Sequence, residues 1–223
     1  MPTLNEVQSP AGLAERIRSG TADAHRDAEE SRFVEALLGG ELTSEGYAEL
    51  LAQSWFVYRE LEEAGRAHAD DPVVAPFLSD ALLRVPALEA DLAFVRGPQW
   101  RETAVARPAA QAYVARLREV AFDDPALFVA HHYIRYMGDL SGGQIIRRRV
   151  SDAYGYQDAG VRFYTFDEIP KTKPFKDAYR ASLDAAPFDS ATQDRVIDEV
   201  RLAFGLNRAL FDDLAGDLDR FRA

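Results

Sequence analysis

The chain has 223 residues, no cysteine, 47% apolar residues and a formal net charge of −11 at pH 7. This apolar content is typical of a globular protein with a core, and the lack of cysteine excludes disulfides, thiolate metal sites and cysteine nucleophiles. The negative charge argues against nucleic acid and anionic membranes as partners, because both would repel the chain.

The N-terminal segment predicts a helix and no targeting signal. Ser9 and Pro10 form an N-cap and first-turn pair, and the helix that they open extends past His25. Residues 1–12 have neither the basic nor the apolar region of a secretory signal. No run of about eighteen apolar residues occurs in the chain, so we expect no membrane span and a cytoplasmic location.

A long helix is predicted next. Thr43 and Ser44 can cap it, and its apolar positions recur at intervals of three and four residues from Tyr47 to Tyr58. Prolines in first-turn positions predict the start of four further helices, at Pro86, Pro108, Pro125 and Pro174.

The helix that follows the N-cap candidate Asp124 is expected to reach about Tyr154 and to end at Gly155. The loop after it contains VRFYTF, the one strand-like stretch of the chain, and the last helix is predicted from about Ser190 to Leu218. These elements indicate an all-α fold of roughly eight or more helices. Without repeats or a linker, we expect one domain over residues 1–223, with flexible ends at 1–9 and 220–223.

Three glycines, Gly138, Gly142 and Gly143, interrupt the helical pattern. Each costs roughly 1 kcal/mol relative to alanine in a helix interior, so a compensating role is expected. Glycine lets a helix bend and a flat ligand approach the backbone, but close packing of helices explains the spacing equally well. The string LSGGQ also matches the signature loop of ATP-binding cassette proteins, whose GxxxxGK[ST] phosphate loop is missing here.

The stretch YIRYMGDLSGGQ, residues 133–144, closely resembles the distal-helix signature of haem oxygenases. TADAHRDAE, residues 21–29, looks like the proximal helix of that family, and FYTF, FKDAYR and AFGLN follow in the family's order. The resemblance covers about residues 12–214. It implies a helical fold with haem b between a proximal and a kinked distal helix. It also implies oxygen- and electron-dependent cleavage of haem at a meso carbon to biliverdin, carbon monoxide and ferrous iron.

The resemblance assigns the iron to His25, whose neutral imidazole would leave the opposite face of haem open. Glu29, one helical turn on, could orient the imidazole by accepting a hydrogen bond from its other nitrogen, or could be a surface carboxylate. We expect structural roles for the other three histidines, His68, His131 and His132.

On the distal side, the resemblance places the three glycines against the ring and makes Asp139 a residue that orders water and relays protons through it. Tyr58, Arg135 and Asn207 match positions that support this water network. For Tyr113 we favour a role in the core.

The propionates of haem need cations. Lys176 and Arg180 share a helix face, and Tyr133 and Arg18 would complete the set. The chain departs from the family at this end, because many members have lysine in place of Arg18. Two aromatic residues, Phe204 and Phe211, either line the apolar pocket or belong to the core.

The reaction that the resemblance implies consumes molecular oxygen and external electrons. Since the chain has no nucleotide-binding fingerprint, the electrons must come from a separate protein. The resemblance implies a ferredoxin or a flavin-containing reductase as this donor. The basic run Arg147, Arg148 and Arg149 could dock an acidic donor, although a solvated basic face is the simpler explanation.

Two other functions compete. A haem carrier would share His25 and the propionate contacts, but it has no need of Asp139 beside bare glycines. Thiaminase-like enzymes have a similar helical fold and depend on a cysteine nucleophile, which this chain does not have.

Overall fold

The computed structural model describes residues 11–222, and in this range the chain forms helices and no β-strand, which confirms the all-α prediction. The α-helices are α1 (Leu13–Gly20), α2 (Ala22–Glu29), α3 (Arg32–Gly39), α4 (Ser44–Ala67), α5 (Val85–Arg96), α6 (Trp100–Thr103), α7 (Pro108–Val120), α8 (Pro125–Asp139), α9 (Gly143–Tyr154), α10 (Thr172–Ala185), α11 (Ser190–Ala215) and α12 (Leu218–Phe221). Three short 3₁₀ helices are η1 (Ala75–Phe77), η2 (Asp80–Leu82) and η3 (Arg162–Tyr164).

The helix starts predicted at Ser44, Pro108, Pro125 and Ser190 are confirmed, whereas α5 begins one residue before Pro86 and α10 two residues before Pro174. Capping side chains mark the starts of α4 and α8. Thr43 accepts a hydrogen bond from the backbone of Gly46 at 3.3 Å, and Asp124 accepts one from Ala126 at 3.0 Å. At the other end, Gly155 takes the left-handed conformation that ends α9, with φ at 72°.

Three expectations need correction. The first helix is interrupted at Thr21, and the long helix breaks between Asp139 and Gly143, so each segment forms two helices. The helix α3 was not predicted. The VRFYTF stretch contains η3 rather than a strand, because buried side chains take up its backbone groups. The N-cap pair Ser9 and Pro10 lies outside the described residues.

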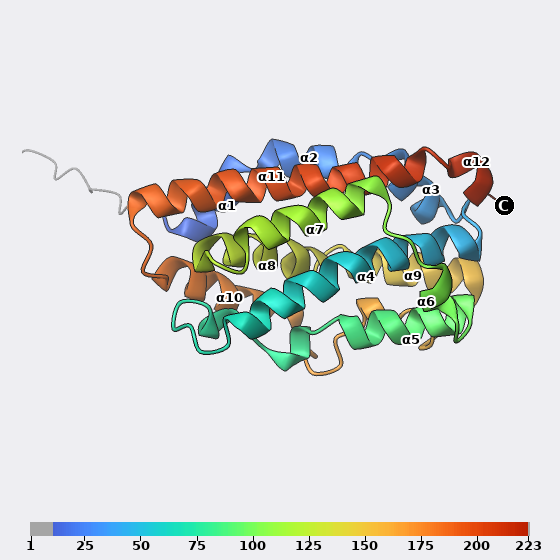
Figure 1. The fold of residues 1–223 in the computed structure, drawn as a ribbon, viewed down its shortest axis with the longest axis horizontal. Coiled ribbons are helices and arrows are strands. Elements are labelled where there is room, and N and C mark those ends of the chain that lie inside the picture. The colour runs from blue at the N-terminus through green and yellow to red at the C-terminus, as the bar shows by residue number, and fades with distance from the viewer. Residues whose placement is uncertain (1–10, 223) are drawn as a thin grey trace, which may run out of the picture.

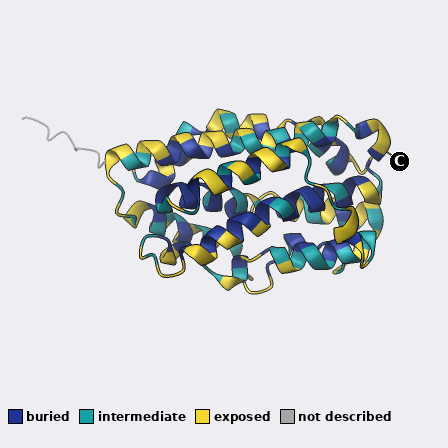
Figure 2. Cartoon of the chain, in the orientation of Figure 1, coloured by how far each residue is buried: buried dark blue, intermediate teal, exposed yellow. Residues whose placement is uncertain are grey.

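The helix α11 organises the bundle. It packs against α2, α3, α7 and α8, while α4 packs against α5, α7 and α8. Figure 1 shows α4, α7 and α11 running along the long dimension of the molecule, and Figure 2 shows the buried residues on their inward faces. Since α2 and α8 pack far more extensively on α11 than on each other, α11 is the element that positions them.

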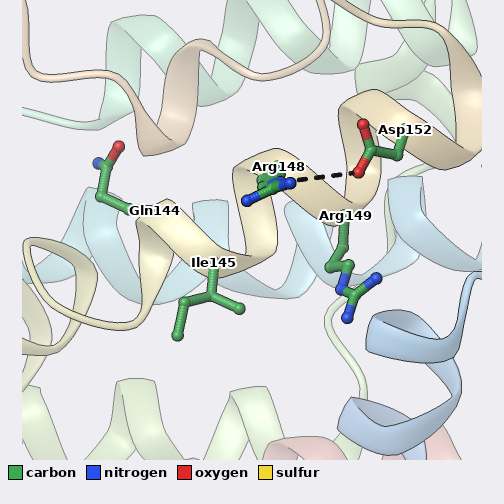
Figure 3. Close-up of a pocket in the computed structure, with 5 residues that line it drawn as sticks. All are labelled: Gln144, Ile145, Arg148, Arg149 and Asp152. Carbon is green, nitrogen blue, oxygen red and sulfur yellow. Dashed lines mark ion pairs between the residues drawn. The ribbon is translucent and has the colours of Figure 1, made fainter.

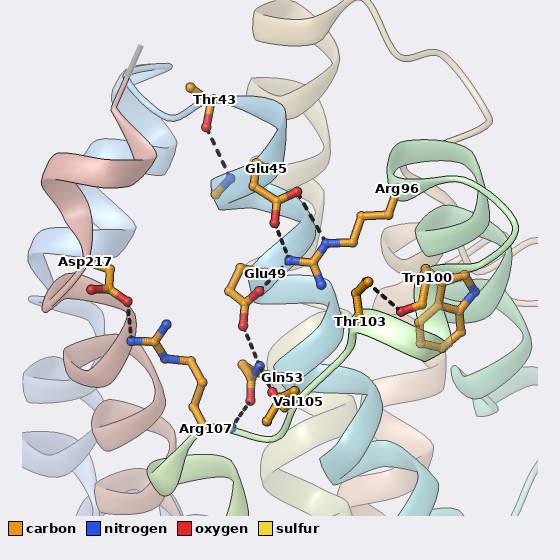
Figure 4. A network of polar contacts seen from close by, with 11 residues as sticks. Thr43, Glu45, Glu49, Gln53, Arg96, Trp100, Thr103, Val105, Arg107 and Asp217 are labelled. Carbon is orange, nitrogen blue, oxygen red and sulfur yellow. Dashed lines mark hydrogen bonds and ion pairs between the residues drawn. The ribbon is translucent and has the colours of Figure 1, made fainter.

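A network of polar side chains joins α4 to α5 and to the start of α7 (Figure 4). Arg96 pairs with Glu49, whose carboxylate accepts a hydrogen bond from Gln53 at 2.7 Å. Gln53 in turn accepts from the backbone of Arg107 at 2.8 Å, and the Arg107 guanidinium reaches Asp217 at 2.8 Å. The network thus ties α4 to α5, to the start of α7 and to Asp217 just before α12.

The end of the described chain is packed. Phe221 is buried, and its carbonyl accepts a hydrogen bond from the Thr43 backbone at 2.7 Å. This packing argues against the flexible end that the sequence predicts from residue 220. Among the described residues, no helix is both long and apolar enough to cross a membrane.

Candidate functional site

A cluster of polar side chains from three helices surrounds the end of α8. Tyr58 of α4 donates a hydrogen bond to Asp139. Arg135, one turn before Asp139, donates to the side-chain amide oxygen of Asn207 in α11 at 2.6 Å. The Arg135 guanidinium also lies over the Tyr58 ring, 4.7 Å from its centre. The structure therefore brings together the four residues that the sequence predicts as one catalytic group.

The charges in this cluster influence one another. Burial raises the pKa of Asp139, while Arg135 and the hydrogen bond from Tyr58 oppose the rise. Burial also keeps the Tyr58 pKa far above its usual value, so this phenol stays a hydrogen-bond donor. The Nε of Arg135 is buried and has no hydrogen-bond partner in the described structure. A buried donor of this kind is a place where water or a ligand can bind.

The cluster extends further than the sequence suggests. The Tyr113 hydroxyl lies 3.5 Å from His131, whose other ring nitrogen is 2.9 Å from Glu199. Burial raises the Glu199 pKa, but hydrogen bonds from His131 and Arg116 outweigh burial and hold it at about 2. Tyr113 is both a core residue, as expected, and a neighbour of this buried hydrogen-bonded pair. No sequence signal marks Glu199, because its partners come from other helices.

The three glycines at the break between α8 and α9 differ in surroundings. A Cβ on Gly138 would meet no atom within 4 Å, and one on Gly142 would meet only the Gly138 carbonyl, at 3.7 Å. By contrast, Gly143 is buried, and its Cβ would lie 3.0 Å from the Tyr164 ring. Open space thus lies beside Gly138 and Gly142, whereas Gly143 is needed for packing. The predicted ligand role of Gly143 does not fit this geometry.

The helix α2 carries His25 on its exposed face. The edge of the His25 ring packs against Phe204 of α11, with ring centres 5.2 Å apart. Arginines of α11 donate hydrogen bonds to the carbonyl of Gly20, the last residue of α1, and to the carbonyl of Asp27 in α2. These contacts fix α2 on α11 and leave the His25 imidazole at the surface. The side chain of Glu29 lies outside what the structure describes, so its predicted bond to His25 stays a prediction.

The predicted propionate ligands come from α1, α8 and α10. Lys176 donates to the Ser141 hydroxyl, in the break after α8, at 3.0 Å. Arg180 and Arg18 both lie close enough to Tyr133 to oppose the rise that burial causes in its pKa. Arg18 is exposed and pairs with Glu15 at 2.8 Å, on the far side of the interruption from His25. The argument that one continuous helix carries both residues is therefore wrong.

The remaining predicted residues pack against the core or form hydrogen bonds within it. Phe211 is half-buried against the core. His68 bonds to the Ala121 carbonyl at 2.8 Å, and His132 to the Tyr179 hydroxyl at 2.7 Å. Burial lowers the His132 pKa to about 3, so this imidazole is neutral near pH 7.

A hollow of about 470 Å³ lies along α9, and its lining begins at Gln144 and ends at Asp152 (Figure 3). Its lining includes Ile145, Arg148 and Arg149, and the Ile145 side chain is 60% exposed. Arg147 turns inward, since its Nε is buried. The predicted run of three arginines thus gives two exposed cations beside an exposed apolar side chain.

Comparisons with known proteins agree with this geometry. The sequence model of the "Heme oxygenase" family matches residues 11–213. Heme oxygenase 1 of Nostoc sp. is 41% identical over 209 residues, covering 93% of this chain and 88% of the relative. Heme oxygenase 1 of Homo sapiens is 38% identical, covering 92% of this chain and 72% of the relative. The crystal structure of heme oxygenase-1 from Synechocystis sp. in complex with heme superposes with a TM-score of 0.89 at 39% identity, covering 94% of this chain and 95% of that chain.

Proposed function

The chain belongs to the haem oxygenase family, and from this premise we propose that it binds haem b and cleaves it at a meso carbon to biliverdin, carbon monoxide and ferrous iron. The observation that supports turnover most strongly is the open space beside Gly138 together with its chain neighbour Asp139, whose carboxylate accepts a hydrogen bond from Tyr58. A haem carrier needs residues that bind the ring and its iron, but it has no use for a carboxylate that relays protons.

The described residues fit haem. A flat ring needs backbone without side chains, and Gly138 and Gly142 supply it. His25 would bind the iron through a neutral imidazole, with Phe204 packing against the edge of that imidazole. Haem supplies the oxygen and redox chemistry, while the protein orients the ring and controls water.

The polar cluster handles protons. The hydrogen bond from Tyr58 occupies one carboxylate oxygen of Asp139, so the carboxylate has further acceptor sites for an ordered water. The positive charge of Arg135, which Asn207 holds in place, favours the ionised form of Asp139 against the effect of burial. We assign Asp139 the role of relaying protons through water, with Tyr58, Arg135 and Asn207 as its supports.

Two cations and a phenol would hold the propionates of haem. Lys176, Arg180 and Tyr133 would contact the carboxylates, and Lys176 would exchange its bond to Ser141 for one to a propionate. Arg18 is a weaker candidate, because it is exposed and already paired with Glu15. Oriented propionates set the rotation of the ring, and that rotation decides which meso carbon lies nearest the polar cluster.

Electrons and oxygen come from outside the protein. We assign electron supply to a ferredoxin or a flavin-containing reductase, which would dock with its acidic surface on Arg148 and Arg149 around Ile145. The cytoplasmic location and the single-domain organisation stay predictions.

A hemin titration followed by absorption tests the proposed site. We expect the wild type to form one haem complex with a sharp Soret band of a histidine-ligated iron. His25→Ala should lose that ligation, and added imidazole should restore it because the small molecule occupies the vacated position. An unchanged spectrum of His25→Ala would show that another residue binds the iron.

A further inference from the structure

Residues 160–166, which contain η3, pack directly behind the polar cluster and are called the buttress loop below. The Phe163 ring lies edge-on to the Tyr58 ring, with centres 5.5 Å apart. The next residue, Tyr164, fills the space that a Cβ on Gly143 would need, and its carbonyl accepts a hydrogen bond from Gln144 at 2.8 Å. The loop thus touches both the partner of Asp139 and the start of α9.

Two buried charged side chains bind the backbone of the buttress loop. Asp91 of α5, which is 0% exposed, accepts hydrogen bonds from the backbone N–H groups of Gly160 at 2.9 Å and Phe163 at 2.8 Å. Arg84, which precedes α5 and is 6% exposed, donates to the carbonyls of Phe163 at 3.2 Å and Thr165 at 2.7 Å. The Asp91 carboxylate thus accepts hydrogen bonds from N–H groups of the loop, and the Arg84 guanidinium donates hydrogen bonds to carbonyls of the loop.

Arg84 is itself held firmly. The Glu62 carboxylate of α4 accepts hydrogen bonds from the backbone N–H groups of Arg84 at 2.6 Å and Val85 at 3.0 Å. The Arg84 guanidinium lies over the Phe166 ring, 3.9 Å from its centre. Arg84 therefore connects α4, the start of α5 and the buttress loop within the core.

A short buried loop always needs partners for its backbone, and neutral side chains or water commonly supply them. Charged side chains give stronger and more directional hydrogen bonds, although burying them is costly. Charged partners are significant at this loop because the loop packs against Tyr58 and beside Gly143. Arg84 is also close enough to Asp139 that its charge opposes the rise in the Asp139 pKa.

We propose that Arg84 and Asp91 are positioning residues for the distal site. By fixing the buttress loop, they hold the Tyr58 ring and the Gly143 end of α9, and so set the geometry of the Tyr58–Asp139 hydrogen bond and the opening beside Gly138. Neither residue touches haem in this account. The inference rests on the proposed function for its catalytic meaning, but its structural part applies to the protein without haem.

Conservative variants test the proposal. Arg84→Lys keeps the charge, but one ammonium cannot reproduce the planar fork that spans two carbonyls. Asp91→Asn keeps the shape but replaces one acceptor oxygen by a donor. Arg107→Lys is the matched control, because Arg107 likewise bridges two elements, reaching both Asp213 and Asp217, yet lies in the network away from Tyr58.

The first readout is amide hydrogen exchange in the haem-free protein. We expect both variants to speed exchange by about tenfold in residues 160–166 and also in residues 138–145, since each loses at least one hydrogen bond of the loop. Arg107→Lys should leave both segments unchanged. If residues 138–145 exchange as in the wild type while the loop is faster, the loop does not position the site and the proposal is wrong.

The second readout is the pH midpoint of the alkaline transition of the ferric haem complex, which reports on the hydrogen bonding of distal water. We expect Arg84→Lys and Asp91→Asn to move this midpoint by about half a pH unit or more, and Arg107→Lys to leave it in place. A purely structural role would lower thermal stability in all three variants without moving the midpoint, and this outcome would overturn the proposal.

A milder variant covers the case in which these proteins do not fold. Phe163→Leu leaves every backbone bond of the loop in place and removes only the ring that packs on Tyr58. It should move the midpoint without changing exchange in residues 160–166, and an unmoved midpoint contradicts the proposal. If the wild type binds haem but does not convert it, the proposed function fails, whereas the exchange experiment still decides the role of the two residues.

Discussion

Tyr164 occupies the space where Gly143 would carry a side chain, so that a Cβ there would lie 3.0 Å from the Tyr164 ring. Gly138, five residues earlier and in the preceding helix, faces open space instead. Glycines that look alike in the sequence therefore serve different ends. One allows an aromatic ring to pack behind the site, and the other keeps a surface bare where haem would lie.

This difference predicts opposite effects of two alanine substitutions. Gly138→Ala should stabilise the haem-free protein by up to about 1 kcal/mol, because alanine favours the helix and meets no atom. It should weaken haem binding by about tenfold or more, because the methyl group enters the space for the ring. Gly143→Ala should lower the unfolding temperature, because buried Tyr164 has to shift. Thermal unfolding and hemin titration measure both effects, and equal behaviour of the two variants would contradict the assignment.

Removing the phenol of Tyr58 should change the acidity of Asp139. Burial raises the Asp139 pKa and the Tyr58 hydrogen bond lowers it, so Tyr58→Phe should raise it further. Carboxyl carbon NMR of the haem-free protein measures this pKa, with Tyr113→Phe as the control that removes a phenol not bonded to Asp139. A lower pKa in Tyr58→Phe would mean that the hydrogen bond stabilises the protonated acid.

The raised pKa of Asp139 also makes the free energy of unfolding depend on pH. Because the folded-state pKa of Asp139 is raised, the folded protein binds this proton more tightly than the unfolded chain. The contribution of Asp139 is therefore most favourable at low pH, and it declines as pH rises through the folded-state pKa. Asp139→Asn should remove that decline from the pH dependence of unfolding.

His132 should make the protein sensitive to mild acid. Its pKa is lowered from 6.5 to about 3 by burial, so the stability it contributes is complete above its usual pKa and is lost as pH falls toward about 3. Between pH 7 and pH 5 the loss should be about 2 kcal/mol. Urea unfolding of the wild type and His132→Asn measures it, since asparagine can keep a bond to Tyr179 without titrating. Parallel pH profiles of the two proteins would exclude this origin.

Charge reversal on α9 should weaken electron delivery. Arg148→Glu should raise the KM for an acidic ferredoxin by about tenfold at low salt, with a smaller effect at high salt because ions screen the contact. Arg66→Glu, on exposed α4 surface, changes the net charge equally and should have little effect. Equal responses of the two variants would place the donor elsewhere.

The sequence predicts correctly those helix starts that depend only on nearby residues. Thr43 and Asp124 cap their helices as expected, because an N-cap needs only its own first turn. The polar group of Tyr58, Arg135 and Asn207 around the end of α8 was also expected, but only through resemblance to a family. No local rule could bring together residues from three helices.

Features that depend on tertiary packing were missed. The break between α8 and α9 turns the Cβ direction of Gly143 inward, and the pattern of glycines does not reveal this. Arg84, just before a predicted helix, and Asp91, within that helix, look like surface residues in the sequence, since charged residues are seldom buried. Their burial becomes apparent only once the loop of residues 160–166 lies against them.

The central claim is that the protein converts haem rather than only holding it. The most direct test is the absorption spectrum of the one-to-one haem complex after ascorbate or a ferredoxin system is added in air. The Soret band should decay while the band of biliverdin and the signal of the carbon monoxide complex appear, and Asp139→Ala should cut the biliverdin yield while haem binding survives. A Soret band that persists in the wild type with a competent reductant would contradict the account and identify a haem carrier.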